Sequence, residues 1–305
     1  MIETVTPPDR PLVVSCVGEG TLAGDVTAGA VPWWSVAKSC IAASALILAD
    51  RGRLELDKPL PGRPFTLRQL LRHEGGVRDY SELPDYFAAV DSGVPPWSDE
   101  ELLTRVDIDV PAYEPGIGWT YSNAGYLLVR RAIEDAYGAD LDTALRDLVF
   151  EPAGVSDVRI ARDPSDLAKG PFGNTINYHP GWVYHGLLTG PPREAALWMH
   201  RLMTGCILSP KLLSMMLERR GLDVKLTPAR PWSTAGYGLG LMMDIATPLG
   251  RCFGHSGEGP GSVCAVYHFP DIVPSRTVAA FAAHQDEAVV EHLVIETAGR
   301  EDAIG

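Results

Sequence analysis

The sequence predicts an α/β protein in which both ends of the chain contribute strands to one sheet domain. Short apolar segments bounded by glycine and proline, a pattern typical of strands, occur near the N-terminus and again in the C-terminal third. Between them, apolar residues recur at three- and four-residue intervals, which indicates amphipathic helices. This order favours a sheet domain formed by residues 1–56 and 200–305, with a mainly helical domain inserted at residues 57–199.

The elements follow from these patterns in chain order. Residues 11–20 and 21–30 are expected to form two strands joined by a glycine-rich turn. A helix is expected to start near Ser35 and to end near Gly52, where glycine is a common stop signal. Further helices are expected at 66–73, 99–106, 123–138, 141–150, 192–205, 209–220 and 287–300, and further strands at 237–246, 261–269 and 276–284.

Composition narrows the class of protein. The net charge of −13 and the lack of a basic tract make nucleic acid a poor candidate partner. The most apolar stretch, residues 41–49, is far shorter than the roughly 20 residues of a membrane span, so no membrane association is expected. The N-terminal residues lack the pattern of a signal peptide, and the five cysteines form no C-x-x-C pair. We therefore expect a cytoplasmic protein without a disulfide framework or a structural zinc site.

The segment PWWSVAKSC places Ser35 and Lys38 three residues apart, on one face of the predicted helix. Taken alone, this pair also fits a helix-capping serine followed by a solvated lysine. Two further motifs favour a catalytic reading: Tyr121-x-Asn123, and His255 with Gly257 at the entry to the strand expected at 261–269. Ser-x-x-Lys and Tyr-x-Asn each occur once in the chain.

His-x-Gly is less specific, because it also occurs at His73 and His179, but neither of those segments leads into an expected strand. His73-Glu74 also begins like the zinc motif H-E-x-x-H, which fails at Val77, so metal chemistry is not expected. The segment GHSGE resembles a G-x-S-x-G nucleophile elbow with Ser256 as nucleophile, but Glu258 occupies the position of the last glycine.

The order Ser-x-x-Lys, Tyr-x-Asn and then a basic residue with Gly two places on resembles the penicillin-recognising serine hydrolases. The chain is most similar to the class C β-lactamase branch, which also holds D-alanyl-D-alanine carboxypeptidases, D-aminopeptidases and β-lactamase-like esterases. The resemblance extends over about residues 11–284. Its further segments, in the order of the family, are RGRLELDKPL, TLRQLLRHEGGV, YEPGIGWTYSNAGYLL, GLLTGPPREAALWMHRLMTG, YGLGLMM and GHSGEGPG.

This resemblance implies a β-lactamase/transpeptidase-like fold, in which helices flank an antiparallel sheet and a mainly helical domain is inserted. It also implies two-step acyl transfer with Ser35 as nucleophile and no cofactor or metal. By resemblance, Tyr121 is the principal base and Lys38 its partner, although the residues themselves leave open which of the two takes the serine proton.

The resemblance also assigns the binding residues. Asn123 is expected to donate its amide near Lys38 or to the substrate carbonyl. His255 and Gly257 would form the third motif, and the backbone N–H of Glu258 would complete an oxyanion hole with that of Ser35.

The sequence departs from the family pattern in two features, the third motif and the N-terminal segment. The third motif of the family is often Lys-Thr-Gly, whereas His255 begins it here, so we expect weaker recognition of a β-lactam carboxylate. The family also commonly has a longer N-terminal segment, and many members carry an export signal, whereas we expect neither feature from this sequence.

We expect a serine hydrolase that acts on small esters, amides or peptides of D-residues. The alternatives are a true β-lactamase or D-Ala-D-Ala carboxypeptidase, and a covalent β-lactam sensor that does not turn over. A catalytically inactive scaffold is a further alternative, which the intact motifs disfavour. The sequence leaves the oligomeric state open.

Overall fold

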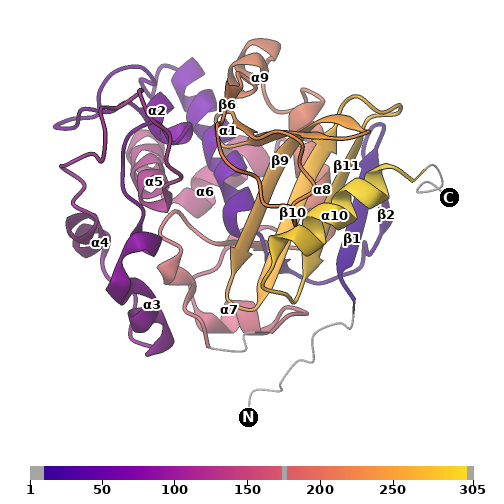
Figure 1. Ribbon diagram of the computed structural model, residues 1–305, viewed down its shortest axis with the longest axis horizontal. Coiled ribbons are helices and arrows are strands. Elements are labelled where there is room, and N and C mark those ends of the chain that lie inside the picture. The colour runs from indigo at the N-terminus through magenta and orange to yellow at the C-terminus, as the bar shows by residue number, and fades with distance from the viewer. Residues whose placement is uncertain (1–9, 174–176, 301–305) are drawn as a thin grey trace.

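An eight-stranded antiparallel sheet is the larger of the two sheets in the computed structural model, which describes residues 10–173 and 177–300 (Figure 1). Its strand order is β2-β1-β11-β10-β9-β8-β7-β6. The strands are β1 (Leu12–Val17), β2 (Thr21–Gly24), β6 (Arg220–Gly221), β7 (Gly236–Tyr237), β8 (Met242–Ala246), β9 (Gly250–Gly259), β10 (Ser262–Phe269) and β11 (Arg276–Ala282). Both ends of the described chain therefore meet in one sheet, as the sequence predicts.

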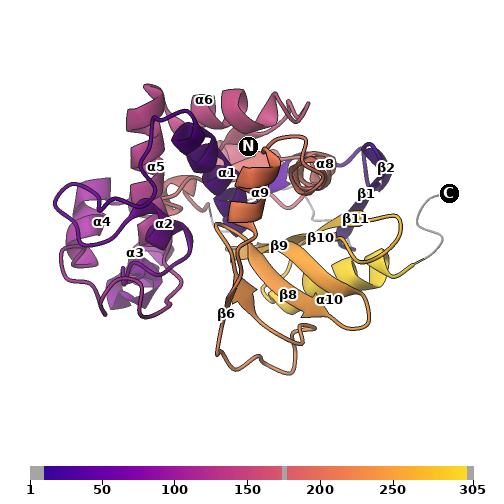
Figure 2. The same cartoon turned by 90° about the horizontal axis from the view of Figure 1, so that it is seen from above.

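Helices cover both faces of this sheet (Figure 2). On one face, helix α10 (Glu287–Ala298) packs its Val290 and Val294 in the same apolar cluster as Ala265 and Tyr267 of β10. On the other face lie α1 (Ala37–Asp50) and α8 (Pro192–Met203), whose core includes the alternate β10 residue Val266. Successive side chains of β10 point to opposite faces of the sheet, and helices cover both faces, so β10 is buried at every position.

Helix α1 is the central helix of the molecule, and its residues from Ala37 to Leu48 are all buried. A helix that is apolar all round lies in the interior of a protein and does not form one side of its surface. Lys38, in the first turn of this helix, is therefore drawn into the core with it and has no exposed surface.

The middle of the chain is mainly helical and lies beside the sheet (Figures 1 and 2). Its helices and the neighbouring α9 are α2 (Leu67–Leu71), α3 (Pro84–Asp91), α4 (Asp99–Arg105), α5 (Asn123–Tyr137), α6 (Leu141–Leu145), α7 (Pro164–Ala168) and α9 (Pro210–Met216). Short 3-10 and π turns are η1 (Trp34–Val36), η2 (Tyr80–Glu82), η3 (Arg146–Phe150) and η4 (Pro180–Trp182). A small sheet joins β3 (Val31–Pro32), β5 (Leu188–Gly190) and β4 (Arg159–Ile160).

The predicted fold class is confirmed, and three local predictions were wrong. The strand expected at 237–246 is a hairpin of β7 and β8, in which Gly240 adopts a φ of +70°. Residues 250–259, expected to lead into a strand, themselves form the long strand β9. The helix expected at 209–220 ends at Met216, and Arg220 begins β6. These segments are held by pairing with neighbouring strands of the sheet, which outweighs their own weak or helical propensity.

The two-domain division remains a prediction. Its boundary at residues 199 and 200 falls inside α8, a helix that packs on β1 and β11 of the sheet. The sheet domain was also expected to include residues 1–9 and 301–305, which lie outside the described part of the chain.

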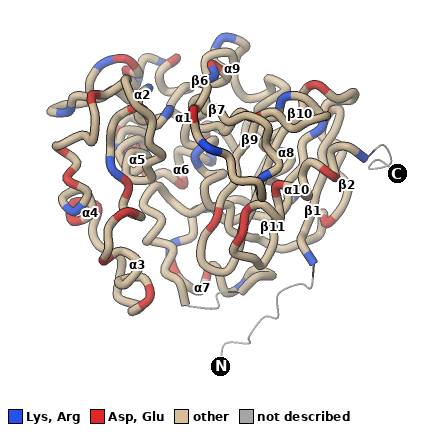
Figure 3. Tube along the Cα trace, in the orientation of Figure 1, with Lys and Arg blue, Asp and Glu red and all other residues tan. Residues whose placement is uncertain are grey.

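Acidic and basic positions are interspersed over the molecule (Figure 3). Several arginines contact carboxylates from distant segments, for example Arg72 with Glu218 and Arg193 with Asp157. Among the described residues, no helix combines the length and the apolar character needed to cross a bilayer.

Candidate active site

Ser35 lies on the 3-10 turn η1, which leads from β3 into the buried helix α1. The predicted helix start near Ser35 is thus confirmed, with one tight turn preceding the α-helix. The preceding residue, Trp34, adopts a φ of +41°, a left-handed conformation that is rare for a bulky side chain. Lys38 follows in the first turn of α1, and its Nζ lies 3.1 Å from Ser35 Oγ.

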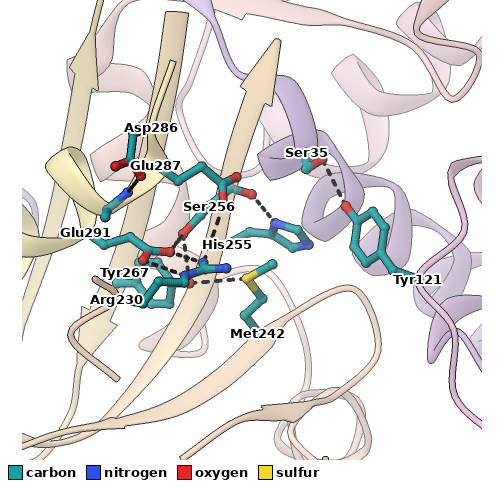
Figure 4. A network of polar contacts seen from close by, with 11 residues as sticks. Ser35, Tyr121, Arg230, Met242, His255, Ser256, Tyr267, Asp286, Glu287 and Glu291 are labelled. Carbon is teal, nitrogen blue, oxygen red and sulfur yellow. Dashed lines mark hydrogen bonds and ion pairs between the residues drawn. The ribbon is translucent and has the colours of Figure 1, made fainter. Parts of the chain in front are cut away.

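The Tyr121–Asn123 motif reaches the same point from the start of α5. The hydroxyl of Tyr121 donates a hydrogen bond to Ser35 Oγ at 2.9 Å (Figure 4), and Asn123 Oδ1 accepts one from Lys38 Nζ at 2.7 Å. The N-cap of α5 is Ser122, whose Oγ accepts from Gly125 N. Because Ser122 caps the helix, the side chain of Asn123 is free to contact Lys38.

Asp79 fixes the orientation of Asn123 and was not found from the sequence. Its Oδ2 accepts a hydrogen bond from Asn123 Nδ2 at 3.0 Å, and its Oδ1 accepts from the backbone N–H groups of Asn123 and Ala124. The amide of Asn123 therefore donates to Asp79 and presents its oxygen to Lys38. This differs from the expectation that Asn123 donates its amide near Lys38 or to the substrate.

Burial separates the proton affinities of the two candidate bases. It lowers the pKa of Lys38 to about 7, although Asp79 and Glu287 partly counter the effect by attraction. Burial also raises the pKa of Tyr121 well above its ordinary value. Near neutral pH, a substantial fraction of Lys38 is therefore the neutral amine, while Tyr121 keeps its proton. These electrostatics favour Lys38 over Tyr121, the residue expected by resemblance, as the acceptor of the serine proton.

Strand β9 carries the third motif, which begins at His255. Its imidazole is completely buried, and burial, followed by repulsion from Lys38, lowers its pKa to about 3. His255 is therefore neutral between pH 6 and pH 8 and supplies no cation for a substrate carboxylate.

A directed series of hydrogen bonds links His255 to the Tyr121–Asn123 segment. The backbone N–H of Ser122 donates to His73 Nδ1, so the proton of His73 lies on Nε2, which contacts the Tyr237 hydroxyl at 3.2 Å. Tyr237 in turn donates to His255 Nε2 at 3.0 Å, and His255 Nδ1 contacts the carbonyl oxygen of Ser256. His255 thus connects β9 to the loop that carries the tyrosine.

Gly257 allows β9 to approach the candidate nucleophile. A Cβ atom at this position would lie 2.6 Å from Ser35 N and 2.8 Å from Trp34 Cβ, so no larger residue fits without a shift. The next residue, Glu258, lies at the cavity beside Ser35. This placement is compatible with an oxyanion site formed by the backbone N–H groups of Ser35 and Glu258.

A cavity of about 570 Å³ opens over Ser35. Its charged side chains are the carboxylates of Asp79, Glu258 and Glu287, and no lysine or arginine is among the described residues that line it. Burial raises the pKa of Glu287 to about 7. Most of the remaining lining is aromatic or apolar, namely Trp34, Tyr80, Tyr86, Phe87, Val90, Tyr178, Val183, Pro260 and Met242.

A buried polar network lies behind the third motif (Figure 4). Ser256 Oγ donates to Glu291 Oε1 and contacts the Tyr267 hydroxyl at 3.1 Å, while Glu291 also pairs with Arg230. Ser256 lies in the interior of strand β9, whereas a nucleophile elbow lies at a turn from a strand to a helix. The surroundings of Ser256 therefore do not support it as the nucleophile.

Four residues of this site were not assigned to it from the sequence: His73, Asp79, His185 and Tyr237. His185 Nε2 lies 3.3 Å from Lys38 Nζ, and the ring of His73 stacks on Tyr121 with a centroid distance of 4.3 Å. Asp79 and His185 lie in no motif of the sequence, whereas His73 and Tyr237 lie in segments that carry the family resemblance but received no role, so only the folded contacts show their places. In the described part of the chain, no group of three or more His, Cys, Asp or Glu side chains is arranged to hold a metal ion.

The fold and these motifs define a class of protein, and comparison with known proteins gives the family. The Beta-lactamase family model matches residues 28–302, and the chain belongs to this family. It is 32% identical to penicillin-binding protein 4* of Bacillus subtilis (strain 168), with 87% of this chain and 63% of that protein covered. It is 27% identical to a D-aminopeptidase of Brucella anthropi, with 74% and 43% covered. The chain thus spans less than two thirds of the length of either relative.

Solved structures confirm the fold. A D-amino acid amidase from Ochrobactrum anthropi SV3 superposes with a TM-score of 0.77 at 20% identity, covering 94% of both chains. A D-stereospecific amidohydrolase from Streptomyces sp. gives a TM-score of 0.74 at 22% identity, covering 92% of both chains.

Proposed function

We propose that this chain is a serine hydrolase that cleaves small esters or amides through an acyl-enzyme. The observation that carries the proposal is the position of Ser35 Oγ, within hydrogen-bond distance of both Lys38 Nζ and the Tyr121 hydroxyl beside a cavity. A serine hydroxyl needs a neighbouring base to become an effective nucleophile, and this arrangement provides one.

In the proposed first step, Ser35 Oγ bonds to the substrate carbonyl carbon while its proton moves to neutral Lys38. The negative charge that develops on the carbonyl oxygen would be stabilised by the backbone N–H groups of Ser35 and Glu258. The bond to the leaving group then breaks, and the leaving oxygen or nitrogen takes a proton from the Lys38 ammonium, either directly or through the Tyr121 hydroxyl, which regains its proton from Lys38. In the second step, water attacks the acyl carbon while one of its protons passes to Lys38. The bond between the acyl carbon and Ser35 Oγ then breaks, and Ser35 Oγ takes the proton back from the Lys38 ammonium.

The charge of the cavity narrows the proposed substrates. Asp79, Glu258 and Glu287 line it, His255 is neutral, and the described lining contains no lysine or arginine, so the charged side chains of the lining would disfavour a substrate carboxylate. Uncharged or amine-bearing substrates with apolar side chains fit this environment better. The names of the relatives, D-aminopeptidase and D-amino acid amidase, support amides and peptides of D-residues as members of that class.

The branch of the family, the cellular location and the activity toward penicillins are also proposals. The Ser-Lys-Tyr arrangement is compatible with the class C branch, and the composition with a cytoplasmic location. Penicillin turnover is the second candidate function, favoured by the similarity to a penicillin-binding protein. The cavity charge argues that such turnover is slow. A covalent sensor has the same acylation step and differs only in failing to release the acyl group.

The test compares kcat/KM for a neutral p-nitrophenyl ester, the p-nitroanilide of D-phenylalanine, which bears an ammonium group, and a p-nitrophenyl ester that ends in a carboxylate. We expect the carboxylate ester to be at least about tenfold poorer than its neutral counterpart. Ser35→Ala should abolish turnover of all three. Glu287→Gln should narrow the gap between the carboxylate and neutral esters. Equal turnover of the two esters would refute the charge argument, and a single burst without turnover would favour the sensor.

A further inference from the structure

His185 lies against the amine of Lys38, in the segment between η4 and β5. Lys38 Nζ has three polar neighbours: Asn123 Oδ1 at 2.7 Å, Ser35 Oγ at 3.1 Å and His185 Nε2 at 3.3 Å. A protonated lysine has three N–H donors, whereas a neutral amine has two N–H donors and one lone pair. The lone pair of the neutral amine therefore points at the neighbour that accepts neither of its two N–H groups.

Toward a Lys38 ammonium, which has no lone pair, Asn123 and His185 can act only as hydrogen-bond acceptors. The Nδ2 group of Asn123 is engaged by Asp79, which turns Oδ1 toward the lysine. Burial and the nearby Lys38 lower the pKa of His185 well below its ordinary value, so its imidazole is neutral. A neutral imidazole facing an ammonium presents an unprotonated nitrogen, which places the His185 proton on Nδ1.

When Lys38 loses its proton, its two remaining N–H groups stay on the two acceptors that have no proton to give, Asn123 and His185. The lone pair is then left for Ser35, the only one of the three neighbours that carries a transferable proton. We propose that His185 is a positioning residue that aims the lone pair of neutral Lys38 at the hydroxyl of Ser35. This inference rests on the proposed function and adds a specific role for a residue outside the three sequence motifs.

The protonation of Lys38 also depends on the other groups that surround it, and these remain in place when His185 is changed. The rings of Tyr121 and Tyr126 lie 4.9 Å and 5.5 Å from Nζ. Asp79 and Glu287 attract the ammonium, and the neutral imidazoles of His73 and His255 lie nearby. The remaining polar neighbours are Ser35 and Asn123.

The experiment compares His185→Leu with His185→Gln, whose side-chain amide can again offer an acceptor to Lys38. kcat/KM for a neutral p-nitrophenyl ester is measured from about pH 5 to about pH 9, with thermal unfolding as a check of folding. We expect His185→Leu to lower the plateau about 10- to 100-fold, the scale of a hydrogen bond to a charged group, and His185→Gln to recover most of the loss.

The pH profile separates positioning from simple damage. Loss of an acceptor destabilises the Lys38 ammonium, so in His185→Leu the acid limb of kcat/KM should move to lower pH than in the unmodified protein. Damage that admits water to the site would move the limb upward, toward the ordinary pKa of lysine. A plateau within about threefold of the unmodified protein, an upward shift, or no recovery in a folded His185→Gln protein would each overturn the proposal.

Two controls distinguish failure of this inference from failure of the proposed function. His268→Leu removes another buried imidazole, whose partner is Thr277, and should leave the profile unchanged. Lys38→Met should lower kcat/KM by about 10²-fold or more. If Lys38→Met remains active, both the proposed base and the proposed role of His185 are wrong. If Lys38→Met is inactive while His185→Leu is unaffected, only the positioning role of His185 is wrong.

Discussion

Asp79→Asn tests whether a carboxylate outside the predicted motifs holds the site in its active arrangement. Asp79 is 4% exposed and accepts four hydrogen bonds: two from Asn123, one from Ala124 N and one from Ser81 Oγ. The amide keeps one oxygen, which can still accept from the backbone N–H groups. Its nitrogen, however, would face Asn123 Nδ2, and two donors cannot bond to each other.

The expected loss follows from that single broken contact. A hydrogen bond to a charged group is worth about 1.5–3 kcal/mol, which corresponds to about 10- to 150-fold. To escape the donor–donor contact, Asn123 would turn its amide and present nitrogen instead of oxygen to Lys38. We therefore expect Asp79→Asn to lower kcat/KM for a neutral ester by about 10- to 150-fold, measured near pH 8.

The loss of kcat/KM in Asp79→Asn should also depend on pH in a specific direction. Asp79 raises the pKa of Lys38 by attraction, so its neutralisation should lower that pKa below about 7. A base with a lower pKa stays deprotonated to lower pH, so the loss relative to the unmodified protein should be smaller at pH 6 than at pH 8.

The matched control is Asp140→Asn, which changes a carboxylate that caps α6 away from the cavity. It should remain within about threefold of the unmodified protein in kcat/KM. A loss below about threefold for Asp79→Asn, or a loss that grows as the pH falls, would refute the reasoning.

Three further predictions concern the motif residues. For the unmodified protein, kcat/KM for a neutral ester should rise with pH through a midpoint near 7, where Lys38 becomes neutral; a flat profile, or a midpoint near that of free lysine, would contradict this assignment. Gly257→Ala should lower kcat/KM by about 10²-fold or more because the new Cβ would lie 2.6 Å from Ser35 N, whereas Gly29→Ala, whose Cβ would meet only Pro171 at 3.7 Å, should have no effect. Lys38→Met and Tyr121→Phe should each lower kcat/KM by about 10²-fold or more. The double variant should be little worse than the poorer single variant, because the two residues act on one proton, whereas additive losses would show separate roles.

The sequence predicted those parts of the fold and site that depend on local pattern. Helix α1 follows from a continuous apolar segment, and β10 and β11 follow from short apolar runs bounded by Gly or Pro. The spacing of Ser35 and Lys38 on one helical turn brought their side chains within 3.1 Å, as expected. Family resemblance supplied the connection between these residues and Tyr121, which no local pattern could have given.

The rest depended on contacts between elements of the fold. Strand β9 has glycines and polar residues that argue against a strand, and it forms because β8 pairs with residues 250–254 and β10 with residues 253–259. Asp79 and His185 lie 44 residues before and 147 residues after the residues they contact, Asn123 and Lys38 respectively. The complete burial of His255, which lowers its pKa to about 3, was also beyond the sequence, which indicated only that a histidine is largely uncharged near neutral pH.

The central claim, that Ser35 is the acylated nucleophile, is tested most directly by mass spectrometry after brief incubation with an activated p-nitrophenyl ester. Peptide mapping should place one acyl group on the segment that contains Ser35, and Ser35→Ala should remain unlabelled under the same conditions. Ser256→Ala should still be labelled at Ser35. Labelling that persists in Ser35→Ala, or that maps to Ser256 in the unmodified protein, would contradict the account.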